Sequence, residues 1–216
     1  MFRHLKITGC KLSSIPPRTF VGLSNLETIT IHTVQDDLIP TDDDASPVLE
    51  SSTSPQPLLD IDYEAFIGLV NLTKVDISRN GIVQVSHRLL CNMGHQVELN
   101  ISHNSIENIE DLGFGVQDGG CDLRVERLDI SHNKIKSLSE GALDKATQLK
   151  HVNAAHNQIN ALDHAAFSRL ANLEYISLSD NKLTALPPGL FDHNPKIKHV
   201  DISENNIGTI HKKIFR

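Results

Sequence analysis

The sequence lacks several features on which common protein classes depend. Its 216 residues include no tryptophan, two tyrosines and three cysteines, and aromatic residues make up 4% of the chain. A core without large aromatic side chains has to be built mostly from Leu, Ile and Val. No long apolar run of about 18 residues occurs, so no membrane-spanning helix is expected within the chain. The start, MFRHLKITGC, lacks the apolar region of a signal peptide.

Motifs for catalysis and metal binding are absent as well. The sequence contains no nucleophile elbow, P-loop or dinucleotide-binding fingerprint, and no C-x-x-C or paired histidines at metal-ligand spacing. The net charge of −7 and the lack of a basic stripe argue against a nucleic-acid partner. The sequence therefore predicts a binding protein without enzymatic activity, metal or cofactor.

A 24-residue pattern, repeated eight times, dominates the chain. It reads L-x-x-L-x-L-x-x-N-x-L-x-x-L-x-x-x-x-F-x-x-L-x-x, the template of a leucine-rich repeat. The copies start at Phe2, Leu26, Leu72, Gln96, Val125, Leu149, Leu173 and Ile197. Asparagine occupies position 9 in six copies, at Asn80, Asn104, Asn133, Asn157, Asn181 and Asn205. Six of the seven phenylalanines occupy position 19.

The residue types of the repeat follow from the geometry of a coil. Positions 4 and 6 alternate inward on a short strand and are therefore apolar, and each strand should pair with that of the next coil, about 4.8 Å away. Asparagine carries both donors and acceptors, so a column at position 9 can satisfy buried backbone groups of adjacent coils. The sequence predicts an α/β-type leucine-rich-repeat solenoid, with a curved parallel sheet on the concave face and irregular turns and short helices on the convex face.

The array is expected to be a single domain over residues 1–216. Both ends lack the polar caps that close a solenoid, so we interpret the chain as a fragment; a complete small protein with frayed ends is the alternative. The second repeat carries an insertion at 36–64, which holds nine acidic residues and no Lys or Arg. We expect a solvated, disordered loop there, and an acidic contact loop for a basic partner is the alternative.

The three cysteines fall into two groups. Cys91 follows position 19 of the third repeat, and Cys121 lies in a five-residue break of the fourth, so both should lie on the outer side of neighbouring coils. Cys10 occupies position 9 of the first repeat, where a small buried residue is expected. We therefore predict a Cys91–Cys121 disulfide and a buried free thiol at Cys10, and three unrelated free thiols are the alternative.

Four stretches give the sequence a resemblance to a known family. They are LKITGCKLSSIPPRTFVGLSNLETITIHT, LDIDYEAFIGLVNLTKVDISRN, the LLCNM that contains Cys91, and NISHNSIENIEDLGFG followed by Cys121 and LDISHNKIKSL. Together they cover most of residues 1–140 and resemble the ectodomains of arthropod Toll receptors, of the long 18-wheeler or Tollo type. Leu90 stands where the family usually has Phe before the cysteine, Gln96 replaces a leucine, and the acidic insertion is longer than the family pattern.

The resemblance implies a location on the extracellular side of the plasma membrane. The parent protein would have a single transmembrane helix and a cytoplasmic TIR domain. The resemblance also implies a protein ligand, such as a cystine-knot cytokine of the Spätzle type, and signalling through receptor dimerisation. No residue of this chain matches a known ligand-contact motif of the family.

Candidate binding residues come from the concave face, because solenoids bind partners through such surfaces. Positions 3 and 5 point outward there and supply Lys74, Asp76, Arg127, Asp129, His151, Tyr175 and His199. Tyr175 is the only aromatic residue on this face and the first choice for a contact. Solvation with weak ion pairs is the alternative explanation of these polar residues.

Two further features concern the surface. N-glycosylation sequons begin at Asn71 and Asn100, and Asn100 should project from the concave face. His103, His132 and His156 occupy position 8 of consecutive repeats and should stack in a column beside that face. Because Ser-His-Asn is a common sequence for this turn, we interpret the column as structural, in preference to a metal site or a pH sensor.

Three function classes remain. The sequence favours the ligand-binding portion of a Toll-type transmembrane signalling receptor. The alternatives are a secreted or matrix leucine-rich adhesion protein without signalling, and an intracellular scaffold. A disulfide and N-linked glycans would exclude the scaffold.

Overall fold

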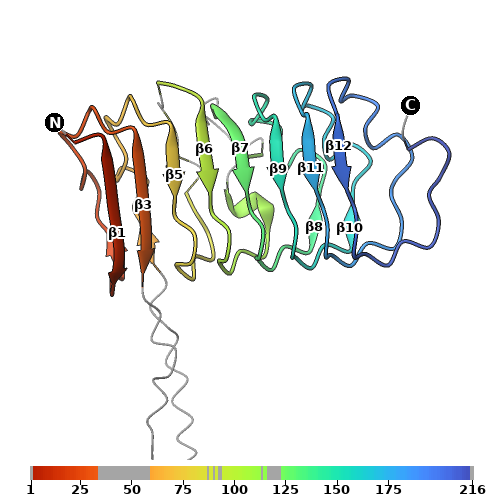
Figure 1. Ribbon diagram of the computed structural model, residues 1–216, viewed down its shortest axis with the longest axis horizontal. Helices are drawn as coiled ribbons and strands as arrows, with labels where there is room; N and C mark the ends of the chain where they lie inside the picture. The colour runs from red at the N-terminus through yellow and green to blue at the C-terminus, as the bar shows by residue number, and fades with distance from the viewer. Residues whose placement is uncertain are drawn as a thin grey trace, which may run out of the picture.

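The computed structural model describes residues 2–33, 59–86, 88–89, 91, 94–112, 114–115 and 123–214 of the chain. These residues wind into stacked coils, and each coil adds one strand to an eight-stranded parallel sheet, called here the main sheet (Figure 1). Its strands follow the chain in the order β1 (His4–Cys10), β3 (Thr28–Thr33), β5 (Lys74–Asp76), β6 (Val97–Asn100), β7 (Val125–Asp129), β9 (His151–Asn153), β11 (Tyr175–Ser177) and β12 (His199–Asp201).

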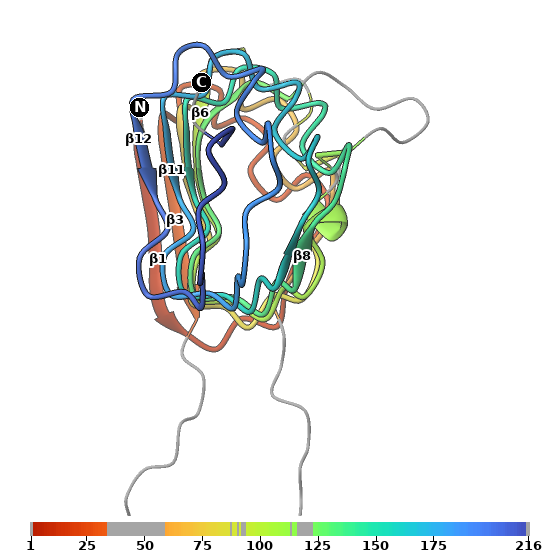
Figure 2. The same cartoon turned by 90° about the vertical axis from the view of Figure 1, so that its right-hand side faces the viewer.

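The opposite side of each coil is built differently. It carries two short parallel pairs, β2 (Ser14–Ile15) with β4 (Asp60–Ile61) and β8 (Ser137–Leu138) with β10 (Ala161–Leu162), and a 3-10 turn, η1 (Ile109–Leu112). Seen along the array, the main sheet and β8 lie on opposite sides of the coil (Figure 2). The predicted fold class is confirmed, although η1 is the only helical segment among the described residues. None of those residues forms a helix long and apolar enough to cross a bilayer.

Positions 3 to 5 stay in register along the whole main sheet, so each of these repeat positions forms a column across it. Tyr175 pairs with His151 on one side and His199 on the other, which is the same repeat position in three successive coils. Strands pair side by side at about 4.8 Å, so residues of one column stand one strand apart. The solvent face of the main sheet, called here the sheet face, is therefore a set of parallel columns formed by positions 3 and 5.

The core lies between the main sheet and the opposite side of the coils. Inward positions 4 and 6 are filled by aliphatic side chains, and Ile176 and Leu178 are fully buried. The phenylalanine rings at position 19 fill the side of the core opposite the main sheet. The ring centroids of Phe20 and Phe66 are 5.9 Å apart, as are those of Phe167 and Phe191. Each coil thus covers its neighbour, so the apolar surface of one repeat is buried only in the stack.

The predicted insertion at 36–64 ends earlier than expected, and residues 59–64 belong to the second coil. Leu59 is buried, and β4 at Asp60–Ile61 pairs with β2 of the first coil. Asp62 accepts a hydrogen bond from the Glu64 amide at 2.8 Å, and Glu64 forms an ion pair with Arg18 at 2.9 Å. The Asp62 carboxylate thus closes a turn of the second coil, and the Glu64 carboxylate joins that coil to the first. The rest of the insertion, 36–58, lies outside the described residues.

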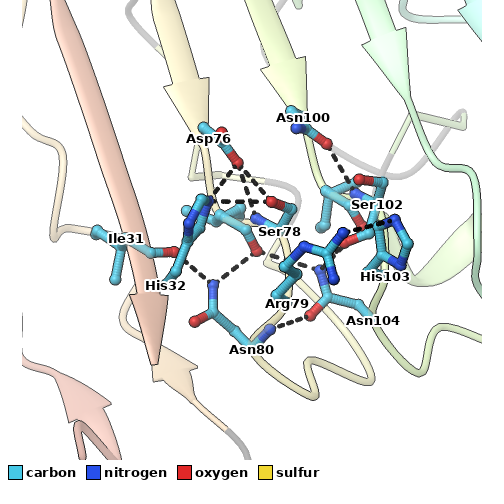
Figure 3. Close-up of polar contacts among 12 residues, drawn as sticks. Ile31, His32, Asp76, Ser78, Arg79, Asn80, Asn100, Ser102, His103 and Asn104 are labelled. Carbon is cyan, nitrogen blue, oxygen red and sulfur yellow. Dashed lines mark hydrogen bonds and ion pairs between the residues drawn. The ribbon is translucent and has the colours of Figure 1, made fainter. Parts of the chain in front are cut away.

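The position-9 asparagines connect successive coils. Asn133 donates from Nδ2 to the Ile101 and Ile130 carbonyls at 3.2 and 3.0 Å, and its Oδ1 accepts from the Ile106 amide at 3.1 Å. Because Ile101 and Ile106 belong to the preceding coil, one amide side chain satisfies buried backbone groups of two coils. The same pattern recurs at Asn80, Asn104, Asn157, Asn181 and Asn205. Figure 3 shows its first members, Asn80 and Asn104.

Removal of one ladder asparagine should be costly in the interior and cheaper at the last coil. Asn157→Ala leaves the buried Ile135 amide without a partner and removes one of two donors to the Ile130 and Ala154 carbonyls, which should cost about 2–4 kcal/mol of unfolding free energy. Asn205 makes the same bonds but is only half-buried, so water can replace it, and Asn205→Ala should cost about 1 kcal/mol. Urea denaturation of both variants measures the difference, and equal losses would contradict a ladder that works by satisfying buried groups.

Candidate functional site

The sheet face is hollowed across β5 to β11. The hollow has a volume of about 450 Å³, and six of the seven residues predicted for this face line it: Lys74, Asp76, Arg127, Asp129, His151 and Tyr175. His199, the seventh, stands one strand further on and stacks against Tyr175. Glu98 and Asn100 also line the hollow. The strands β5, β6, β7, β9 and β11 thus bring side chains from five coils to one surface.

The position-3 column has a charged half and a ring-bearing half. Glu98 lies between two cations, 3.9 Å from the Lys74 ammonium and 3.4 Å from the Arg127 guanidinium. Further along, the Tyr175 ring lies 5.9 Å from that of His151 and 4.9 Å from that of His199, parallel to the latter. Burial, with the charge of Arg127, lowers the pKa of His151. This half of the column therefore presents aromatic rings beside a half that carries two cations and one carboxylate.

The side chains of the position-5 column form hydrogen bonds within the protein. Asp76, Asn100 and Asp129 each accept, through Oδ1, the amide of the residue two positions on, at 3.0–3.1 Å. Such side-chain to backbone bonds close the turn that ends each strand. Asn153 also donates to both oxygens of Asp129 at 3.2 Å. The two candidate aspartates are thus engaged within the protein, and their removal would disturb the sheet face as well as its charge.

A serine, a histidine and an aspartate meet at one end of this column (Figure 3). Ser78 Oγ donates to Asp76 Oδ1 at 2.7 Å, and His32 Nε2 lies 3.1 Å from both Ser78 Oγ and Asp76 Oδ1. Although burial raises the pKa of Asp76, the bonds from Ser78 and His32 outweigh it and keep that pKa below its usual value. In a hydrolytic triad the serine and the aspartate contact different imidazole nitrogens, whereas here both meet Nε2. The cluster therefore stabilises the Asp76 carboxylate and lacks the geometry to activate Ser78.

The two sequons have different surroundings. Asn71 is half-buried at the end of the second repeat, and its Nδ2 donates to the Ser24 carbonyl of the preceding coil at 2.8 Å. Asn100 lies on β6 in the hollow, between Asp76 and Asp129 in the register. Any glycan attached to Asn100 would have to occupy the hollow.

The three position-8 histidines lie in a stack of parallel rings. The ring centroids of His103 and His132 are 4.0 Å apart, and those of His132 and His156 are 4.1 Å apart. All three histidines have positive φ, between 52° and 54°. Positive φ also occurs at the same repeat position in Arg79, Asp180 and Glu204. Histidine, like Asn and Asp, is enriched in this left-handed region, which accounts for its use in the turn. Stacked rings do not converge on one point, and no cluster suited to a metal ion occurs among the described residues.

Charged side chains cap the two ends of this stack. The Arg79 guanidinium lies 3.3 Å from His103 Nε2, and His156 Nδ1 lies 2.6 Å from the Asp180 carboxylate. Since guanidinium only donates and carboxylate only accepts, His103 Nε2 must be unprotonated and His156 Nδ1 must carry a proton. Burial, followed by neighbouring cationic groups, lowers the pKa of His103, and burial followed by His156 lowers that of His132. Sequence reasoning located the histidines but missed both caps, which the same position of the adjacent repeats would have revealed.

One cysteine prediction was wrong. Cys10 is exposed and free, and its Sγ lies 3.7 Å from the Thr8 carbonyl. It lies on β1, which has a single neighbouring strand, and the pairing of β1 with β3 shifts register between Thr8 and Cys10. Position 9 is therefore not covered as it is in later coils. Cys91 is disulfide-bonded, while Cys121 lies outside the described residues, so the Cys91–Cys121 pairing stays a prediction.

Mild acid should weaken the fold through the histidine column. The pKa values of His103 and His132 lie below the ordinary 6.5, so below that pH the unfolded chain binds more protons than the folded one. Their stabilising contribution is complete above pH 6.5 and is lost as the pH falls through the folded-state values. Unfolding free energies from urea titrations should therefore decline as the pH is lowered below about 6.5.

The decline should be smaller when His103 and His132 are both replaced by Asn, which tolerates the left-handed backbone. His193→Asn, at a turn outside the column, is the matched control. An unchanged pH slope in the double variant would show that the column does not titrate in this window.

The thiols should be separable by a peptide map. Non-reducing digestion should recover a Cys91–Cys121 peptide, and the bridge, closing a loop of about 30 residues, should contribute roughly 3–4 kcal/mol. Cys10 should react with iodoacetamide in the folded protein because it is exposed. Recovery of Cys10 in a disulfide with either other cysteine would refute this assignment.

Comparisons with known proteins agree with this geometry. The family pattern described as "Leucine rich repeat" matches residues 147–207, and that described as "BspA type Leucine rich repeat region (6 copies)" matches residues 45–117. A relative named Toll-like receptor 7, from Drosophila melanogaster, is 29% identical over 155 residues, which cover 69% of this chain. The chain spans only 10% of the length of that relative.

Solved structures share the fold. One described as the Toll–Spatzle complex of Drosophila matches 99% of this chain with a TM-score of 0.70 and 20% identity, and its glycosylated form matches with a TM-score of 0.73. A structure described as a TLR13–ssRNA13 complex matches 96% of the chain with a TM-score of 0.73 and 21% identity. This chain covers 25% of each of those chains. Together with the repeat and the main sheet, these findings show that the chain is a leucine-rich-repeat array similar to the ectodomains of Toll-type receptors.

Proposed function

We propose that this chain is part of the extracellular ligand-binding region of a Toll-type transmembrane signalling receptor, and that it binds a protein through the sheet face. The hollow across β5 to β11 is the observation that carries the proposal, because it gathers cations, carboxylates and an aromatic row on one surface. The likeness to Toll-like receptor 7 and to a chain of the Toll–Spatzle complex supports a receptor role and a location on the extracellular side of the plasma membrane.

The charge of the sheet face favours a protein over a nucleic acid. Nucleic-acid sites neutralise several phosphates with Lys and Arg. Here Lys74 and Arg127 share Glu98 between them, and Asp76 and Asp129 line the same hollow. A phosphate backbone would meet these three carboxylates. A protein partner, such as a Spätzle-like cystine-knot cytokine, can present both signs of charge and an apolar anchor for Tyr175.

Within this surface we assign the contact to the half around Tyr175. Its ring stacks on His199 and meets the tilted ring of His151 on the other side, and aromatic groups held in this way are typical of residues that dominate binding energy. The half around Asn100 stays open only without a glycan, because that residue stands in the hollow. Glycosylation at Asn100 would shift the contact further toward Tyr175 and His199.

Binding of Drosophila Spätzle to the immobilised chain tests the proposal. Tyr175→Ala should weaken binding about 30-fold, the effect expected of a central aromatic contact, and Arg127→Ala should weaken it about fivefold. Tyr63→Ala is the matched control, since Tyr63 is the only other tyrosine and lies outside the hollow. Asp129→Asn removes the charge but can keep the turn, as Asn100 and Asn153 do at the same position.

Glycopeptide mass spectrometry of Asn71 and Asn100, with binding of Asn100→Gln, completes the test. A single-stranded RNA should not compete for the sheet face. Binding that Asp129→Asn abolishes and Tyr175→Ala leaves intact would overturn the assignment to the Tyr175 half. Binding that none of these variants alters would overturn the sheet face as the ligand surface.

A secreted or matrix adhesion protein without signalling is the competing function. The two differ in the parent protein, not in the repeats. The parent reading frame should encode an apolar segment of about 20 residues, followed by a cytoplasmic α/β domain. A parent that ends without either would favour the adhesion protein.

A further inference from the structure

The histidine column has a cation at one end and an anion at the other. Two copies of the column placed antiparallel would therefore bring opposite charges together at both ends. We call the five side chains at position 8 of coils three to seven the histidine ridge: Arg79, His103, His132, His156 and Asp180. His132 stands at its centre, with one histidine on each side, a cation at one end and an anion at the other. Consecutive coils are about 4.8 Å apart, so the two charges are separated by roughly 19 Å.

The ridge is accessible over its length. Arg79, His132, His156 and Asp180 are exposed, and His103 is partly so. The stacked rings, at 4.0 and 4.1 Å, hold the side chains in a straight, ordered row. The end groups keep hydrogen-bonding capacity, because Arg79 uses one of its two terminal nitrogens on His103 and Asp180 uses one of its two oxygens on His156.

We propose that the histidine ridge binds the ridge of a second copy of this chain in antiparallel orientation. A two-fold axis at His132 places Arg79 of each copy opposite Asp180 of the other, and His103 opposite His156. An interface of this kind is isologous, because the same patch serves both copies. A shift by one coil would set Arg79 against Glu204, the position-8 residue of the eighth coil, but it leaves Asp180 opposite His103. The remaining registers leave Arg79 or Asp180 without an opposite charge or bring like charges together, so only the register centred on His132 pairs both end charges.

Neighbouring charges set limits on the association. Lys134 follows His132 by two residues, so the Lys134 side chains of the two copies would approach each other near the two-fold axis. Their like charges disfavour the contact. Glu107 is paired with Lys136 at 2.6 Å, and this bond, followed more weakly by the charge of Lys134, keeps the pKa of Glu107 low. Asp129 lies close enough to influence His103 and His132 electrostatically. A narrow polar ridge with these neighbours should give a weak, reversible pair at neutral pH.

Sedimentation velocity of the chain, from micromolar to millimolar concentration at about pH 7.4, tests the proposal. A reversible dimer is expected. Arg79→Glu and Asp180→Arg should each weaken it at least tenfold, since each turns two attractive pairs into repulsive ones. The double variant Arg79→Glu/Asp180→Arg should recover the affinity, because the reversed ridge is again self-complementary. Both Glu and Arg occur at this backbone position in the natural chain, at Glu204 and Arg79, so the variants should fold.

Two controls distinguish the ridge from other modes of association. Arg169→Glu reverses a charge that is 71% exposed and outside the ridge, and it should leave the dimer unchanged. Once the pH falls below the lowered pKa values of His103 and His132, these two rings gain charge, and the two ridges should repel and dissociate. In a Cys10→Ser background, His132→Cys should form a disulfide-linked dimer under mild oxidation, whereas Arg169→Cys should not.

The proposal fails if the natural chain stays monomeric throughout the concentration range. It also fails if the double charge reversal does not restore a dimer lost in the single variants, or if Arg169→Glu weakens association as much as Arg79→Glu. None of these outcomes depends on the sheet face or on the ligand.

Discussion

The structure depends on how buried backbone groups at the turn after each main-sheet strand are satisfied. A strand of three to seven residues followed by a sharp turn leaves amide and carbonyl groups inside the coil, where water cannot reach them. In coils three to eight, one asparagine per coil bonds carbonyls of its own and the preceding coil, and accepts an amide of the preceding coil, as Asn133 does. The repeat can therefore turn within a few residues and still bury Leu, Ile and Val on both sides of that turn.

The fixed stacking of each coil on its neighbour determines which side chains lie next to each other on the surface. Because every coil repeats the same bonds, each outward position becomes a straight column, and the chemistry of the surface is decided by which residue each repeat places there. On the sheet face this gives the row of Lys74, Glu98 and Arg127 beside the rings of His151, Tyr175 and His199. Beside that face it gives the histidine ridge. The two proposed binding surfaces thus differ in chemistry but arise from one geometrical rule.

Sequence alone predicted what the repeat determines. Positions 4, 6, 9 and 19 have one environment in every interior coil, so the fold, the core and the columns could be read from the 24-residue pattern. The exceptions are places where neighbours differ. Cys10 is exposed because β1 has one neighbouring strand, and residues 59–64 are ordered because Leu59 and Ile61 return to the repeat pattern after the acidic stretch. The sequence also did not predict that Asp76 and Asp129 close turns. An outward carboxylate was interpreted as a binding group because its backbone hydrogen bond is visible only in the structure.

Amide hydrogen exchange of individual residues tests the role of the asparagines most directly. The amides of Ile82, Ile106, Ile135 and Ile159 lie in turns without strand pairing, and each donates to the side chain of an asparagine one coil further on. If the ladder holds the coils together, these amides should exchange only through global unfolding, and Leu183, bonded to the half-buried Asn205, should exchange faster. Exchange of the four isoleucine amides at the rate of ordinary surface turns would contradict the account.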